Sequence, residues 1–188
     1  MRVITGKYKG RHFDVPRAFK ARPTTDFAKE NIFNVVMGYM DIEDVTALDL
    51  FSGTGSITLE MLSRGCSHVT SVEADRDHAR FISQCLAKLN VENHTLIRGD
   101  VFRFVKSCKK KFDFIFADPP YALPTLAEIP DKVLPLLADG GLFVFEHGKQ
   151  YDFSANPLFR EHRAYGSVNF SIFKREGLEQ EQEQEEEN

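Results

Sequence analysis

Short apolar runs alternate along the chain with longer segments in which apolar residues recur at every third or fourth position. The short runs predict buried strands over residues 45–51, 68–72, 95–98, 112–117 and 142–146. The longer segments predict helices over residues 27–40, 57–64, 77–89, 101–108 and 126–137. Because strands and helices alternate, we expect an α/β fold built on a mostly parallel sheet.

The two ends of the chain depart from this alternation. Residues 2–15 alternate and turn at Lys9-Gly10, which predicts a basic β-hairpin within an N-terminal extension over residues 1–20. Residues 163–173 predict two strands around a tight turn, which suits an antiparallel hairpin added to a parallel sheet. We therefore expect the main domain over residues 21–175 and a disordered Glu/Gln-rich tail over residues 176–188.

The net charge of −4 conceals an uneven distribution. Residues 1–30 contain eight bases and three acids, whereas residues 176–188 contain seven glutamates and no base. Without that tail the body is positive, so its basic faces are suited to phosphate groups. Composition alone does not separate a nucleic-acid contact from an ordinary solvated surface.

Length and composition narrow the class of protein. The 188 residues, 42% of them hydrophobic, suit one globular domain with a full core. No apolar run approaches the roughly 20 residues of a membrane span, so we expect a soluble, cytoplasmic protein without a membrane partner. Three cysteines, Cys66, Cys85 and Cys108, lie far apart without clustered histidines, which indicates neither a disulfide framework nor a metal site.

The strand over residues 112–117 ends abruptly in Asp118-Pro119-Pro120-Tyr121. Proline has no N–H and restricts the residue before it, so the sheet ladder stops here and Asp118 is held extended. Ligands of open α/β sheets bind beyond the carboxyl ends of the strands. There the Asp118 carboxylate and the Pro119 carbonyl can each accept one N–H of a nucleobase amine, while Tyr121 stacks on the ring. The simpler alternative is a rigid turn.

A glycine-rich loop over residues 52–56 joins the first buried strand to a helix. Gly53 and Gly55 let the backbone approach a ligand and leave free N–H groups at the helix start. Thr58 stands where the dinucleotide fingerprint has its last glycine, and the P-loop lysine is missing, so pyrophosphate binding is disfavoured. Asp49, just before the loop, is a candidate either to accept from a ligand ammonium or to order the loop.

Two further acids follow later strands. Glu73 ends the second strand, 24 residues after Asp49, where α/β nucleoside sites hold the ribose hydroxyls. Asp100 follows the third strand and is a candidate to accept from an adenine amine. Each also has a structural alternative as a helix cap, and for Asp100 the two roles are compatible because a carboxylate has two oxygens.

These motifs carry a family resemblance. Asp49-x-Phe51-x-Gly53-Thr54-Gly55, Glu73, Gly99-Asp100 and Asp118-Pro119-Pro120-Tyr121 resemble class I S-adenosylmethionine-dependent methyltransferases that methylate amines. More narrowly, Arg2-Val3-Ile4-x-Gly6-Lys7-Tyr8-x-Gly10-Arg11 and Arg22-Pro23-Thr24-x-Asp26 are similar to the RsmD-type family, bacterial enzymes that modify the N2 amine of a guanine in small-subunit (16S) ribosomal RNA. The resemblance runs to about residue 174. This sequence departs from the family pattern at Phe27, where a basic residue is commoner, and in the acidic tail.

The resemblance implies a Rossmann-like, seven-stranded sheet with an antiparallel last strand. It also implies a monomer that needs no metal, uses S-adenosylmethionine, and acts on ribosomal RNA in the small subunit or an assembly intermediate. The implied site residues are catalytic Asp118, Pro119 and Tyr121, cofactor-binding Asp49, Phe51, Gly53, Gly55, Glu73, Asp100 and Val101, and substrate-binding Arg11, Arg22 and Pro120. Two alternatives stay open: an adenine-N6 methyltransferase on DNA or RNA, and a non-catalytic RNA-binding or ribosome assembly factor with the same fold.

Overall fold

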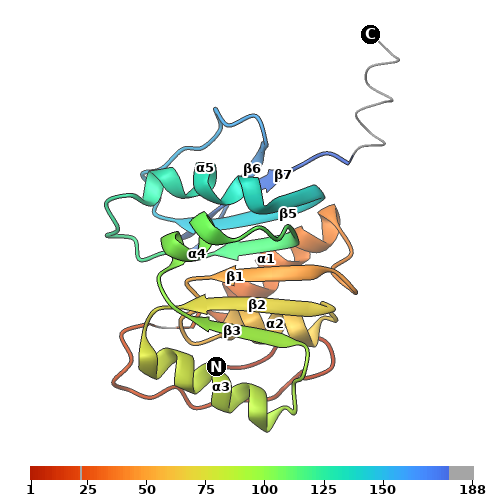
Figure 1. Ribbon diagram of the computed structural model, residues 1–188, viewed down its shortest axis with the longest axis vertical. Helices are drawn as coiled ribbons and strands as arrows, with labels where there is room; N and C mark the ends of the chain where they lie inside the picture. The colour runs from red at the N-terminus through yellow and green to blue at the C-terminus, as the bar shows by residue number, and fades with distance from the viewer. Residues whose placement is uncertain (22, 178–188) are drawn as a thin grey trace.

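The computed structural model describes residues 1–21 and 23–177. Its strands form one seven-stranded sheet in the order β3-β2-β1-β4-β5-β7-β6 (Figure 1). The strands from β3 to β5 pair in parallel, and β7 pairs antiparallel with both β5 and β6. Their bounds are β1 Thr46–Leu50, β2 His68–Glu73, β3 His94–Arg98, β4 Phe112–Ala117, β5 Leu137–His147, β6 Phe159–Tyr165 and β7 Val168–Lys174. The predicted α/β fold with an antiparallel last strand is confirmed.

Helices cover both faces of the sheet. Helices α1 (Asp26–Tyr39) and α2 (Ser56–Ser63) lie behind it in Figure 1, and with α3 (Arg76–Lys88) they share one apolar core with that face. Helices α4 (Val101–Ser107) and α5 (Ile129–Val133) cover the front. The central strands are therefore buried on both sides, which explains why they read as near-continuous apolar runs. None of the described helices has the length and apolar character needed to span a membrane.

The predicted helix over residues 126–137 is wrong in detail. The structure divides it into a 3₁₀ turn (Leu126–Glu128), α5, and a second 3₁₀ turn (Leu134–Leu136). Pro130 lies in the first turn of α5, where its missing N–H does no harm, but Pro135 lies two residues beyond the end of α5 and prevents its continuation. Both prolines were readable in the sequence as interruptions of the helical pattern.

Gly140 and Gly141 form an irregularity inside β5, which begins earlier than the strand predicted over residues 142–146. The strand begins at Leu137, and its pairing with β4 shifts register between Phe112 and Phe114. Gly140 has a φ of +71°, and a Cβ at Gly141 would lie 2.7 Å from the Ala138 carbonyl oxygen. A bulge of this kind needs glycine. Because adjacent glycines are also typical of turns, the sequence alone does not distinguish the two.

The N-terminal segment folds back on itself with less regular structure than the alternation predicts. A single antiparallel bridge joins Arg2 and His12, and the backbone of Val3 bonds to that of Arg11. The segment then passes α3, where the ring of Phe19 packs 4.5 Å from that of His78, measured between centroids. In Figure 1 this red part of the chain runs past α3. The segment thus reaches the sheet edge where the parallel strands end.

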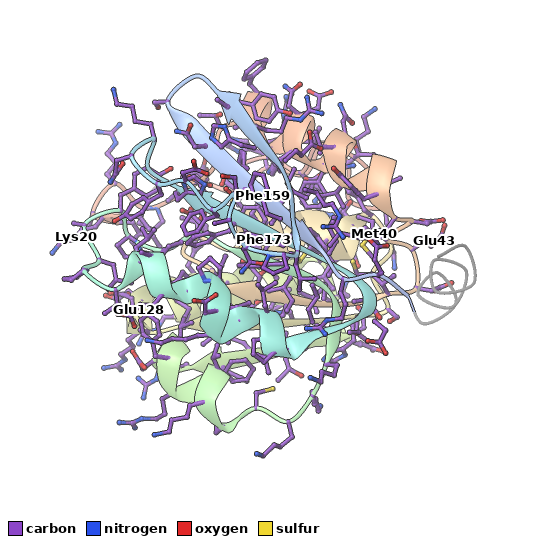
Figure 2. All side chains as sticks on the ribbon, turned by 90° about the horizontal axis from the view of Figure 1, so that it is seen from above. Lys20, Met40, Glu43, Glu128, Phe159 and Phe173 are labelled. Atoms are coloured by element: carbon purple, nitrogen blue, oxygen red, sulfur yellow. The ribbon has the colours of Figure 1, made fainter. Side chains whose placement is uncertain are left out.

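The parallel strands β1 to β5 all end at one edge of the sheet. Figure 2 shows Lys20 at this edge and Met40, which follows α1, at the opposite one. The acids Asp49, Glu73, Asp118 and Glu146 lie at or just beyond the ends of β1, β2, β4 and β5. The topology therefore gathers four carboxyl groups from distant parts of the chain.

Candidate active site

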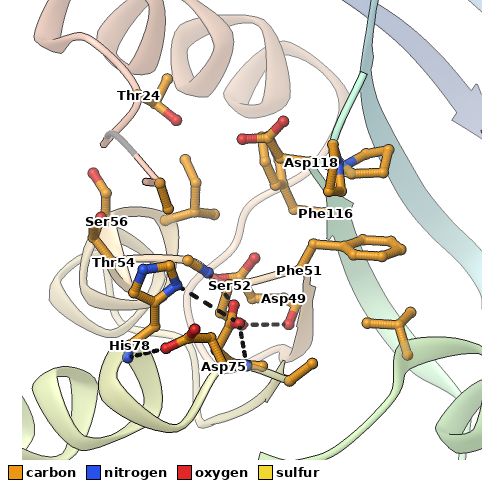
Figure 3. Close-up of a pocket in the computed structure, with 18 of the residues that line it drawn as sticks. Thr24, Asp49, Phe51, Ser52, Thr54, Ser56, Asp75, His78, Phe116 and Asp118 are labelled. Atoms are coloured by element: carbon orange, nitrogen blue, oxygen red, sulfur yellow. Dashed lines mark hydrogen bonds and ion pairs between the residues drawn. The ribbon is translucent and has the colours of Figure 1, made fainter. Parts of the chain in front are cut away.

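A cavity of about 940 Å³ opens at this carboxyl edge. It is lined by the loop after β1, the end of β2, the start of α4, the loop after β4, and the segment before α1. Figure 3 shows Thr24, Asp118 and His78 on different sides of it, with Asp49 between them at depth. The structure therefore brings the predicted glycine loop, acids and Asp-Pro-Pro-Tyr segment into one pocket.

The loop after β1 has the backbone conformation of a tight ligand-binding turn. Gly53 and Gly55 have φ values of +55° and +79°, and Phe51, which is not a glycine, has a φ of +59°. A side chain at Gly55 would place its Cβ 2.9 Å from Ile82 of α3. Left-handed backbone at a bulky aromatic is unfavourable, and such outliers cluster at functional sites. The ring of Phe51 lines the pocket.

Glu73 fastens this loop to β2. One carboxylate oxygen accepts the Gly53 N–H at 2.6 Å, and the other accepts the Asp75 N–H at 2.8 Å. His78 adds a ring nitrogen 3.8 Å from the same carboxylate. Because an ionised carboxylate offers about four acceptor positions, Glu73 keeps free positions for ligand hydroxyls.

Asp100 caps α4, which confirms the structural role that the sequence offered for it. Its carboxylate accepts the Arg103 N–H at 2.8 Å, and its side chain also lines the pocket. Val101, the first residue of α4, is buried and lines the pocket beside it. Capping uses one oxygen, so the other is available to a ligand.

Asp49 is almost completely buried beneath the loop. It accepts from the Thr58 hydroxyl at 2.6 Å, and that hydroxyl also contacts Ser71 at 2.6 Å. Burial raises the pKa of Asp49 to about 7, and the bonds from Thr58 only partly oppose this. Its contacts therefore show it ordering the loop and α2, while it also lines the pocket floor.

Asp118 stands at the tip of β4. Its N–H still donates to the Leu50 carbonyl at 3.3 Å, the last bond of the β1–β4 ladder before the prolines. Burial, followed by the negative charges of Glu146 and Asp49, raises its pKa well above the ordinary value. Pro119 is buried, whereas Pro120 and Tyr121 are exposed, with 40% of Tyr121 accessible. The ring of Tyr121 is free to stack on a ligand.

Sequence reasoning missed Glu146, at the end of β5. Its carboxylate accepts from the Tyr121 hydroxyl at 2.7 Å and is 7% exposed. Burial raises its pKa, and the bond from Tyr121 opposes that rise. The only signal in the sequence was an acid ending an otherwise apolar strand, in the same place as Glu73 in β2.

The structure does not bring Arg11 to the pocket. Its guanidinium lies 3.4 Å from the carbonyl oxygen of Lys88, at the C-terminal end of α3, whereas the pocket is at the other end of that helix. A helix of 13 residues is roughly 20 Å long. Arg22 and most of the predicted tail, residues 178–188, lie outside the described residues.

The comparisons with known proteins agree with this arrangement. A family model described as Conserved hypothetical protein 95 matches residues 1–174. Ribosomal RNA small subunit methyltransferase D of Escherichia coli K12 is 31% identical over 182 residues, covering 94% of this chain and 90% of that protein. YlbH of Bacillus subtilis 168 is 33% identical over 187 residues, covering 94% and 100%. The solved structure of yhhF from Escherichia coli has a TM-score of 0.82 at 30% identity, covering 94% and 98%.

Sheet order and pocket together define a class I methyltransferase fold. Within that class, the chain belongs to the RsmD-type methyltransferase family, the family described as Conserved hypothetical protein 95. The predicted family resemblance is confirmed.

Proposed function

We propose that this protein transfers a methyl group from S-adenosylmethionine to the exocyclic N2 amine of a guanine in small-subunit ribosomal RNA. The observation that carries the proposal is that Asp118, Pro119 and Tyr121 line the same pocket as Gly53 and Glu73. A donor site and an amine site are therefore adjacent. The name of the Escherichia coli relative, which specifies the small-subunit ribosomal RNA, supports this substrate class.

The pocket fits the cofactor in size and chemistry. Its volume of about 940 Å³ is at the upper end of the ~300–1,000 Å³ typical of ligand sites. Glu73 would hold the ribose hydroxyls, Asp100 and Val101 the adenine, and the backbone at Gly53 and Gly55 the amino-acid part. When bound, S-adenosylmethionine supplies a methyl group activated by a positively charged sulfur.

The residues at the end of β4 would prepare the amine. A nucleobase amine is a poor nucleophile because its lone pair is delocalised into the ring. If Asp118 and the Pro119 carbonyl each accept one N–H, the lone pair turns toward the methyl group. Holding the partners in line can lower the barrier by about 7–11 kcal/mol, so we assign most of the catalysis to positioning.

The guanine must be unpaired or flipped out to enter this pocket, at roughly a few kcal/mol. Stacking on the exposed ring of Tyr121 would offset part of that. Our candidates for contacts with the RNA are Lys20 and Pro120, which line the pocket, Arg11, which lies beside the C-terminal end of α3, and Arg22. We place the reaction in the cytoplasm, where bacterial ribosomes are assembled, and assign it to a monomer.

The test is transfer of labelled methyl from S-adenosylmethionine to small ribosomal subunits that lack the modification, followed by digestion to nucleosides. We expect the label in N2-methylguanosine. Label in N6-methyladenosine would overturn the substrate assignment, and no label with either RNA or DNA, together with no cofactor binding, would favour a binding protein.

A substitution at Asp118 tests whether this residue acts on the target amine. Asp118→Ala should abolish transfer while leaving S-adenosylmethionine binding within a few-fold, because the carboxylate serves the amine and not the cofactor. Asp139→Ala is the matched control, since Asp139 is an exposed carboxylate near the other end of β5. Unchanged turnover in Asp118→Ala would contradict the assigned role.

A further inference from the structure

Glu146 is a buried acid to which the proposed reaction assigns no role. One carboxylate oxygen accepts from the Tyr121 hydroxyl at 2.7 Å, and the other is buried with no hydrogen-bond partner in the part of the chain that the structure describes. A buried carboxylate oxygen without a partner is costly, by about 1–3 kcal/mol or more. Such a group therefore calls for a proton or a ligand to satisfy it.

The register of the sheet places Asp118 beside Glu146. Ala117 of β4 pairs in parallel with Phe145 of β5, so Asp118 and Glu146 are the next residues on adjacent strands. Residues in register on neighbouring strands point to the same face, with Cβ atoms about 5 Å apart. Two carboxyl groups thus stand side by side at the base of the amine site.

The other groups around this pair are few. Tyr121 donates to Glu146, and β7 places the apolar Phe170 opposite it. Asp49 of β1 contributes a further negative charge to Asp118. The buried Lys29 of α1 directs its ammonium to Glu60, 3.7 Å away, and so is engaged elsewhere.

His147, the next residue, does not join the pair. Its side chain points to the opposite face of β5, and its ring nitrogens contact the Ser171 hydroxyl at 2.7 Å and the Gly148 carbonyl oxygen at 2.8 Å. Among the residues that the structure describes, no cation is paired with either carboxyl group. Two adjacent carboxyl groups in that setting share a proton, because both cannot be ionised at short distance.

We propose that Glu146 is a positioning residue that shares one proton with Asp118 and makes the pair the acceptor of the proton lost by the target amine. The inference rests on the proposed function. As the N–C bond forms, the C–S bond breaks and its electron pair stays on sulfur, so the product nitrogen must release one proton. The singly protonated pair takes up that proton and becomes neutral. It later returns the proton to solvent.

The alternative is that Glu146 only holds the ring of Tyr121 in place. The two roles make different predictions for the pH dependence of transfer. Glu146→Gln keeps an oxygen that can accept from Tyr121 but removes the charge beside Asp118. Tyr121→Phe keeps the ring and both carboxyl groups but removes the bond that favours ionised Glu146.

The experiment measures single-turnover methyl transfer to unmodified small subunits as a function of pH. For Glu146→Gln we expect at least a tenfold lower rate, with the acid limb of the profile moved to higher pH, because a neutral amide no longer shares the proton that stabilises the singly ionised pair. For Tyr121→Phe we expect the acid limb to move to higher pH. A Glu146→Gln profile that superimposes on that of the wild type, or that shifts to lower pH, would overturn the proposal.

A second readout needs no turnover. Carboxyl ¹³C resonances of the free protein, assigned by their loss in Glu146→Gln and Asp118→Asn, should show two coupled titrations, and in each variant the surviving acid should titrate in one step between those two pH values. Independent titrations in the wild type would contradict a shared proton. If the wild type methylates no guanine but the coupling is present, the proposed function fails and the proton-sharing pair stands.

Discussion

The ammonium of Lys29 in α1 lies 3.7 Å from the carboxylate of Glu60 in α2, and both side chains are at most 1% exposed. Lys29 also donates to the Arg2 carbonyl at 2.6 Å. Glu60 accepts the N–H groups of Ile4 and Thr5 at 2.9 and 3.1 Å. This buried ion pair therefore fastens the N-terminal segment to the two helices behind the sheet.

We expect Lys29→Met to lower the free energy of unfolding by about 1–3 kcal/mol, because it removes buried hydrogen bonds to the Arg2 carbonyl and the Ser56 hydroxyl, while Arg64 stays 3.0 Å from Glu60. Urea denaturation measures this. The control is Lys132→Met, which removes the exposed Lys132–Glu128 pair of the same type and should change stability by less than about 1 kcal/mol. Equal losses in the free energy of unfolding would show that burial of the Lys29–Glu60 pair does not increase its contribution to stability.

The elements that the sequence predicts best are those set by local periodicity. The strand predicted over 112–117 matches β4, and the helix predicted over 27–40 matches α1 to within one residue at each end. The place of Glu146 could not be predicted, because it depends on the register between β4 and β5, which joins residues far apart in sequence. The position of Arg11 likewise depends on the path of an irregular segment.

Gly55→Ala tests the tight turn above Asp49. Its φ of +79° strains any side chain, and the new Cβ would meet Ile82 at 2.9 Å, a stiff β-branched neighbour. Gly10→Ala is the matched control, because Gly10 has a φ of +81° and open space around it. We expect Gly55→Ala to destabilise the protein by about 1–3 kcal/mol more than Gly10→Ala does. Equal losses in urea denaturation would mean that only the backbone angle matters.

Glu73→Gln tests the loop's attachment to β2. An amide has a single acceptor oxygen, so it cannot serve both the Gly53 and the Asp75 N–H groups. Losing a bond to a charged group costs about 1.5–3 kcal/mol, so we expect S-adenosylmethionine to bind roughly 10- to 150-fold more weakly by calorimetry. Asp77→Asn, in the first turn of α3, changes a carboxylate that Glu73 does not contact and should bind within threefold. Unaltered affinity for S-adenosylmethionine in Glu73→Gln would show that Glu73 does not contribute to cofactor binding.

Asp49 should make stability depend on pH in a definite direction. Burial raises its pKa from 3.8 to about 7, so the folded protein keeps this proton over a range where the unfolded chain has lost it. The stabilising contribution is therefore complete below about pH 4 and is lost as the pH rises toward about 7. Asp49→Asn removes the titration, so the stability of the wild type relative to this variant should fall between about pH 4 and about pH 7 and then level off. Urea denaturation of both proteins across that window measures the difference, and a difference that stays constant with pH would mean that Asp49 is ionised in the folded protein.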